Sequence, residues 1–94
     1  MTAAARSPRL AQGAEVFARH IRGGVLLLGP TDREPLQLLG AAALVWAGLA
    51  QPTTTDALVR RLATDCGLEA SQIDATVADV IAELGRRRLT VAAP

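Results

Sequence analysis

The hydrophobic pattern of this 94-residue chain changes its period at Gly40, and that change constrains the fold more than any other feature of the sequence. Before Gly40, short apolar runs are separated by Gly, Pro and Asp, which is typical of strands joined by turns. After Gly40, apolar residues recur three and four positions apart, as they do along one face of a helix. The pattern therefore predicts a small α+β domain in which antiparallel strands precede helices.

Three strands are expected before Gly40, over residues 15–22, 25–28 and 35–39. Gly23 and Gly24 separate the first two, and both accept the positive φ angles of a tight hairpin turn. Pro35 lacks an N–H, which suits the start of a strand or the edge of a sheet. Residues 1–14 show no sustained period, so we expect a flexible N-terminal arm followed by one domain over residues 15–91.

Three helices are expected after Gly40. The first covers residues 41–50; the second is capped by Thr53 or Thr54 and ended by Gly67 in the left-handed conformation. The third begins at residue 70 or 71 and ends at Arg87, with a core-facing stripe of Ile73, Val77, Val80, Ile81 and Leu84. A three-stranded sheet this small cannot bury its own apolar face. The expected fold is therefore winged helix-turn-helix-like, a three-stranded antiparallel sheet packed on three helices.

Composition excludes several classes of partner. Ten basic residues, all Arg, stand against nine acidic ones, and a net charge of +1 indicates neither a nucleic-acid nor an anionic-membrane surface. The longest uncharged apolar run, residues 40–50, is too short for a membrane span, which needs about 20 residues. Residues 1–13 lack the apolar core of a secretory signal, so we expect a cytoplasmic protein.

Few residues of this chain are suited to catalysis. Cys66 is the single cysteine and His20 the single histidine, so neither a disulfide nor a Cys/His metal site is expected. Cys66 follows Leu58 and Leu62 at helical spacing and is interpreted as a small buried hydrophobe. His20 is interpreted as a partly exposed strand residue, and Trp46 as the large anchor of an aliphatic core. We therefore expect no enzyme, no cofactor and no metal.

The order and spacing of four stretches of the sequence are typical of one protein family. These stretches are the apolar run 25–28, the segment 36–46 that ends in Leu44, Val45 and Trp46, the segment 53–58, and residues 77–84 with Leu89. Together they resemble the PqqD-like family of RiPP recognition elements, the leader-peptide-binding modules of ribosomal peptide natural-product pathways. The likeness covers residues 16–91 and is greatest to small free-standing versions found beside lasso-peptide leader peptidases. The chain departs from the family pattern by carrying Leu39, Ala41, Thr76 and Val80 where members usually have Asn, Ser or Thr, Asp and an aromatic residue.

The resemblance implies a non-catalytic protein that binds the leader segment of a precursor peptide and delivers it to a maturation enzyme. A leader peptidase of lasso-peptide biosynthesis is the first candidate for that enzyme, and a radical-SAM enzyme the second. The leader would add as an antiparallel strand beside the third strand, whose open edge offers unpaired N–H and C=O groups, and would pack on the semi-polar flank of the third helix. The residues expected to contact it are Leu36, Gln37, Leu38, Leu39, Ile73, Thr76, Val77, Val80, Glu83 and Arg87.

Two other functions are compatible with strands followed by three helices. A winged-helix DNA-binding protein is the first alternative, but the third helix carries Asp74 and Asp79, which phosphate would repel. A scaffold that only docks onto an enzyme is the second. Three consecutive arginines, Arg86 to Arg88, have two interpretations, a solvated helix end stabilised by the dipole or a surface for acidic partner residues.

Overall fold

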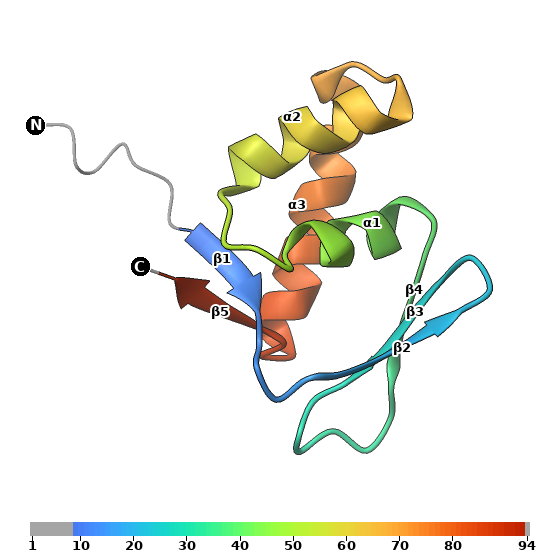
Figure 1. Ribbon diagram of the computed structural model, residues 1–94, viewed down its shortest axis with the longest axis vertical. Helices are drawn as coiled ribbons and strands as arrows, with labels where there is room; N and C mark the ends of the chain where they lie inside the picture. Colours follow the sequence, from blue (N-terminus) through green and yellow to red (C-terminus); the bar gives the residue numbers. More distant parts are fainter. Residues whose placement is uncertain (1–8, 94) are drawn as a thin grey trace, which may run out of the picture.

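The computed structural model describes residues 9–93, and it folds them into two small sheets and three helices (Figure 1). This confirms the predicted α+β order, a three-stranded antiparallel sheet followed by three helices. Helix α1 contacts β3 and β4 as well as α2 and α3, so it joins the sheet to the other helices. The elements are β1 (Arg9–Gln12), β2 (Phe17–Ile21), β3 (Gly24–Leu28), β4 (Leu36–Leu39), α1 (Ala41–Gly48), α2 (Thr55–Cys66), α3 (Ala70–Arg86) and β5 (Thr90–Ala93).

The main sheet has the strand order β2-β3-β4, with both pairs antiparallel. Its first turn needs two glycines for different reasons. Gly23 has a φ of 76°, the left-handed conformation expected of a tight turn. Gly24 already belongs to β3, and a Cβ there would lie 2.0 Å from the Leu38 carbonyl oxygen. Any side chain at residue 24 would therefore push β4 away from β3.

The ends of α2 lie where the sequence predicts them. The Thr54 hydroxyl accepts a hydrogen bond from the Ala57 N–H at 3.1 Å, so Thr54 is the N-cap. At the other end Gly67 has a φ of 67°, and the Leu68 N–H donates to the Ala63 carbonyl at 2.8 Å. That bond satisfies one of the last carbonyls of the helix, as in the usual glycine C-cap.

The core lies where one face of the sheet meets the three helices. Trp46 is only 5% exposed, which confirms it as the large anchor, whereas Phe17 is 79% exposed on the surface. The predicted stripe of α3 is buried at Ile73, Val77 and Leu84 and half-buried at Val80 and Ile81. The other buried apolar residues are Val25, Leu27, Leu38, Val45, Leu49, Leu58, Leu62, Ala63 and Leu89.

A second sheet, which the sequence analysis did not predict, pairs β1 with β5. The flexible arm expected over residues 1–14 is therefore wrong for residues 9–12; residues 1–8 lie outside the described residues. Further hydrogen bonds hold β1 to the helical layer, among them one of 3.0 Å from the Gln12 backbone N–H to the Leu49 carbonyl. Leu10 and Thr53 exchange backbone hydrogen bonds of 2.7 and 3.0 Å, and the Gln12 side-chain amide donates to the Trp46 carbonyl at 2.7 Å. Backbone pairing of two distant segments orders this stretch, and it leaves no periodic signal in so short a strand.

No helix within residues 9–93 has both the length and the apolar character needed to cross a bilayer.

Candidate functional site

The strand β4 is one edge of the main sheet, and its outer side is open. β4 pairs with β3 alone, and within residues 9–93 no strand lies on its other side. The C-terminal strand β5 (Thr90–Ala93) pairs with β1 instead and does not cover β4. An uncovered edge strand offers a row of hydrogen-bonding groups that another polypeptide can satisfy.

The register identifies which backbone groups of β4 face outward. The Gly40 N–H donates to the Gly23 carbonyl at 2.9 Å, which makes this the first hydrogen-bonded pair of the β3–β4 ladder. Such pairs alternate along an antiparallel ladder, so the even-numbered residues of β4 bond to β3. The N–H and C=O groups of Gln37 and Leu39 therefore point toward the open edge.

The side chains of β4 alternate between the two faces of the sheet. Leu38 is buried, and Leu36 is half-buried against the core. Gln37 is exposed, and Leu39 is 51% exposed on the opposite face. Of the four β4 residues predicted to meet the peptide, Leu36, Gln37 and Leu39 present side-chain surface in this structure, and Leu38 supports the strand from the core.

The residues of α3 that were predicted to contact the peptide also fall into a buried group and an accessible group. Ile73 and Val77 are 2% and 0% exposed, so both pack in the core of the peptide-free structure. Their contact with the peptide stays a prediction, and the same helical period that places them beside the flank places them on the buried face of α3. Thr76 is exposed, and Val80 is half-buried at the margin of the core. The accessible flank of α3 is Thr76, Val80, Glu83 and Arg87.

The end of α3 is linked to the start of β4. The Arg87 guanidinium donates to the Glu34 backbone carbonyl at 3.4 Å, and its Nε lies 3.6 Å from a Glu83 carboxylate oxygen. Arg86 also pairs with Glu83. The sequence analysis did not single out Glu34, because a backbone acceptor leaves no mark in the choice of side chain.

A polar hollow of about 530 Å³ lies at this junction, between the loop that precedes β4 and the arginines at the end of α3. Its charged residues are Asp32, Arg33, Glu34, Arg86, Arg87 and Arg88, so four positive charges face two negative ones. The cations outnumber the carboxylates next to the open strand. An acidic residue of a bound peptide would be attracted to this end of the site.

The single histidine and the single cysteine, the residue types most often used as a catalytic base or nucleophile, both lie on the surface. His20 is exposed on β2, as predicted. Cys66 is exposed as well, so its interpretation as a buried hydrophobe is wrong. It is the last residue of α2, one turn beyond the buried Leu62, so helical spacing alone overestimates how far the buried stripe extends. Within residues 9–93, His, Cys, Asp and Glu do not cluster in a group that could hold a metal ion.

The family model for PqqD, described as coenzyme PQQ synthesis protein D, matches residues 24–89. The chain belongs to the PqqD family. The matched region starts at β3 and ends just before β5, so it contains β4 and α3 and both sides of the candidate site. The resemblance seen in the sequence is confirmed at the level of the family. No curated protein sequence matches the chain significantly.

Two solved structures share the PqqD fold with this chain. TbiB1, solved in complex with the TbiA(beta) leader peptide, is 15% identical with a TM-score of 0.74, and the alignment covers 89% of this chain and 98% of TbiB1. The PqqD truncation of Methylobacterium extorquens PqqCD is described as a functional, stand-alone RiPP recognition element. It is 19% identical with a TM-score of 0.70, and 88% of each chain is covered. None of these comparisons supports the DNA-binding alternative.

Proposed function

We propose that this protein binds the leader segment of a ribosomally made precursor peptide as an added strand on β4, and that it performs no chemistry itself. The observation that carries the proposal is the open β4 edge, with the backbone groups of Gln37 and Leu39 directed outward, in a chain of the PqqD family. The structural neighbour TbiB1 was solved with a leader peptide, which supports the same class of ligand here.

Strand addition explains how one small domain can bind a peptide without a deep pocket. Main-chain hydrogen bonds supply affinity, and side chains beside the new strand supply specificity. Val80 offers partly exposed apolar surface on α3, and Arg87 and Glu83 offer charge at the same flank. A docked segment of five or six residues would reach a Kd of about 0.1–10 μM, or roughly −7 to −9.5 kcal/mol.

The protein would then deliver the bound leader to a maturation enzyme in the cytoplasm. A leader peptidase of lasso-peptide biosynthesis is the first candidate, and a radical-SAM enzyme the second. A carrier that holds the leader while it also contacts the enzyme raises the effective concentration of substrate at the active site. To distinguish the two enzymes, each is purified and its turnover of the precursor is measured with and without this protein. The partner is the enzyme whose turnover this protein increases.

The direct test is a pair of substitutions at Gln37, measured with the leader of the precursor peptide encoded nearest to this protein's gene. Gln37→Pro removes an outward N–H, and an edge strand tolerates proline where the N–H faces solvent. Gln37→Ala keeps the N–H and removes only an exposed side chain. We expect calorimetric titration to show at least a tenfold weaker Kd for the proline variant and less than a threefold change for alanine.

A second substitution tests the α3 wall. Val80→Asp places a carboxylate on the half-buried flank, and leader affinity should fall by tenfold or more in a variant that circular dichroism shows to be folded. Thr64→Asp, on the exposed surface of α2, is the matched control and should leave affinity unchanged. If Gln37→Pro and Val80→Asp both bind the leader as the wild type does, the β4–α3 site is wrong.

A further inference from the structure

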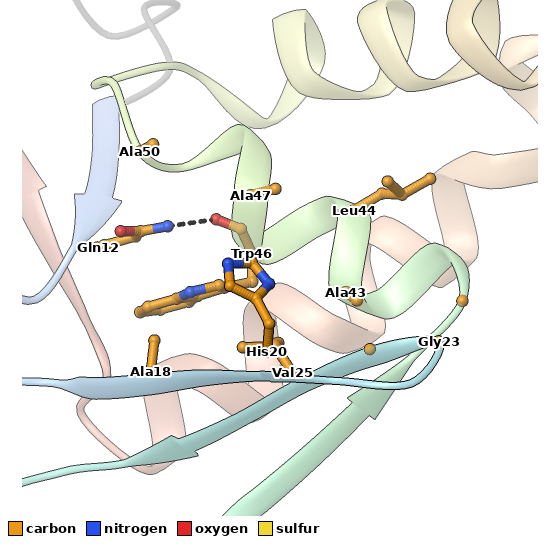
Figure 2. Close-up of a pocket in the computed structure, with 12 residues that line it drawn as sticks. Gln12, Ala18, His20, Gly23, Val25, Ala43, Leu44, Trp46, Ala47 and Ala50 are labelled. Carbon is orange, nitrogen blue, oxygen red and sulfur yellow. Dashed lines mark hydrogen bonds between the residues drawn. The ribbon is translucent and has the colours of Figure 1, made fainter.

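A hollow of about 520 Å³ lies at the other edge of the main sheet, between β2 and α1 (Figure 2). This volume falls within the range of about 300–1,000 Å³ that ligand pockets occupy. Ala18 and His20 point into it from β2, and Ala43 and Ala47 line it from α1 (Figure 2). The hollow shares no lining residue with the predicted leader site, although Gly40, which directly follows β4, is part of its lining.

The hollow is open because the residues around it carry little side chain. Seven of its twelve lining residues are Ala or Gly, so the space between the strand and the helix is not filled. The core holds α1 in place nearby, since Val45 and Leu49 are 0% and 1% exposed. The buried Trp46 forms part of the lining, and the Gln12 amide that bonds to its carbonyl lies at the rim (Figure 2). The hollow is therefore preformed and mostly apolar.

The backbone of β2 is open on the same side. The odd-numbered residues of β3 bond to β4, so its even-numbered residues bond to β2, and the register pairs these with the odd-numbered residues of β2. The N–H and C=O groups of Ala18 and His20 therefore face outward, and within residues 9–93 no strand lies beside them. A polypeptide that paired with this edge would direct every second side chain toward α1, and so into the hollow.

Charge indicates which kind of polypeptide fits. The chain has no Asp or Glu between Val16 and Thr31, while Arg19, His20 and Arg22 are exposed there. A segment that carries carboxylates is attracted to this hairpin. A second copy of the chain is disfavoured, because β2 paired with β2 would bring these basic side chains opposite one another.

We propose that the hollow between β2 and α1 is a second docking site, which takes an aliphatic side chain from an acidic, extended segment of a partner protein that pairs with β2. The site is independent of leader binding at β4. It would allow one domain to hold two polypeptides at once, one on each edge of its sheet.

Trp46 is the only tryptophan of the chain, so its fluorescence reports occupancy of the hollow without a label. The probe is the blocked pentapeptide acetyl-Asp-Val-Leu-Val-Asp-amide, and the matched probe has Ser in place of Leu. We expect a saturable change in Trp46 emission with the leucine probe, and at least tenfold weaker binding of the serine probe. Amide chemical shifts of Ala18 and His20 should move with the same titration curve.

Two variants make the test specific for the hollow. Ala47→Leu fills it from an exposed position of α1, and should weaken the leucine probe at least tenfold while leader affinity stays within twofold. Ala82→Leu makes the same change on the exposed surface of α3, and should alter neither. Thermal unfolding of both variants establishes that they are folded.

The proposal is overturned if the leucine probe gives no saturable change at millimolar concentration, or if it binds no better than the serine probe. A dimer in sedimentation, together with amide shifts of Ala18 and His20 that change with protein concentration in the absence of probe, would overturn it too, as would probe-induced shifts that map to β4. Leader affinity is measured on the same protein in a separate titration. A failed probe with normal leader binding therefore rejects this site and leaves the proposed function untouched.

Discussion

The Arg87 guanidinium donates a hydrogen bond to the backbone carbonyl of Glu34 over 3.4 Å, and so ties the end of α3 to the chain just before β4. These two elements are the sides of the proposed leader site. The contact links residues 53 positions apart in the sequence, and it lies beside the cationic hollow at the same end of the strand. Four predictions concern this region and the helix ends that position it.

Arg87→Ala should weaken leader binding about three- to tenfold, because the link between the two sides of the site is lost. The cost in folding free energy should stay below about 1 kcal/mol, since the bond is long and partly exposed to water. Arg60→Ala is the control, because Arg60 is an exposed arginine on α2, away from both sides of the site. Calorimetric titration and denaturant unfolding measure the two quantities; equal losses of affinity in both variants would contradict a role for the link.

Arg88→Gly should stabilise the fold. Arg88 has a φ of 60°, and the Leu89 N–H donates to the Leu84 carbonyl at 2.9 Å, so α3 ends as α2 ends at Gly67 but with an arginine in the left-handed position. Glycine removes the steric cost of that conformation, and we expect a gain of about 0.5–1 kcal/mol and a Tm higher by about 2–8 °C. Arg86→Gly, within the helix, should lower the Tm instead. A lower Tm for Arg88→Gly would show that the arginine side chain contributes more than its backbone conformation costs.

Thr54→Ala should destabilise the protein by about 1 kcal/mol, because the Ala57 N–H loses its acceptor at the start of α2. Thr55→Ala changes the next residue, already inside the helix, and should cost less than about 0.5 kcal/mol. Urea unfolding followed by circular dichroism measures both. Similar midpoints for the two variants would mean that the cap does not contribute to the stability of this fold.

Charge reversal at the end of α3 should slow leader association if the leader carries acidic residues there. The double variant Arg86→Glu with Arg88→Glu removes cations from the hollow beside β4, so the association rate should fall about tenfold and its salt dependence should flatten. Arg60→Glu with Arg61→Glu reverses two exposed arginines on α2 and is the matched control. Stopped-flow measurement of the leader association rate at two salt concentrations tests this prediction. Identical rates for the charge-reversal variant and the wild type would mean that the arginines are only a solvated helix end.

The elements around the candidate site were predictable because each has an apolar stripe that must be buried. The stripe through Ile73, Val77 and Leu84 identified α3, and the glycines at 23 and 67 identified a turn and a helix end. The same periodicity misplaced Cys66, which continues the stripe of Leu58 and Leu62 but is exposed. Periodicity shows which residues share a face, but neighbouring elements decide how far along that face burial extends.

The strand β1 shows the opposite case. Nothing in the sequence of Arg9–Gln12 predicts a strand, because its order comes from pairing with β5 at the far end of the chain and from the Gln12 bond to Trp46. Backbone hydrogen bonds between distant segments do not require particular side chains, so they leave no local hydrophobic pattern in the sequence.

The order of strands and helices and most residues of the core could be predicted from the chain alone, because they follow from local periodicity, turn residues and residue type. The edge positions of β2 and β4, the pairing of β5 with β1 and the hollow that small residues of two distant segments enclose beside β2 could not be predicted in this way. An open edge and an unfilled space depend on where other segments of the chain do not pack, and this is known only once the whole fold is assembled.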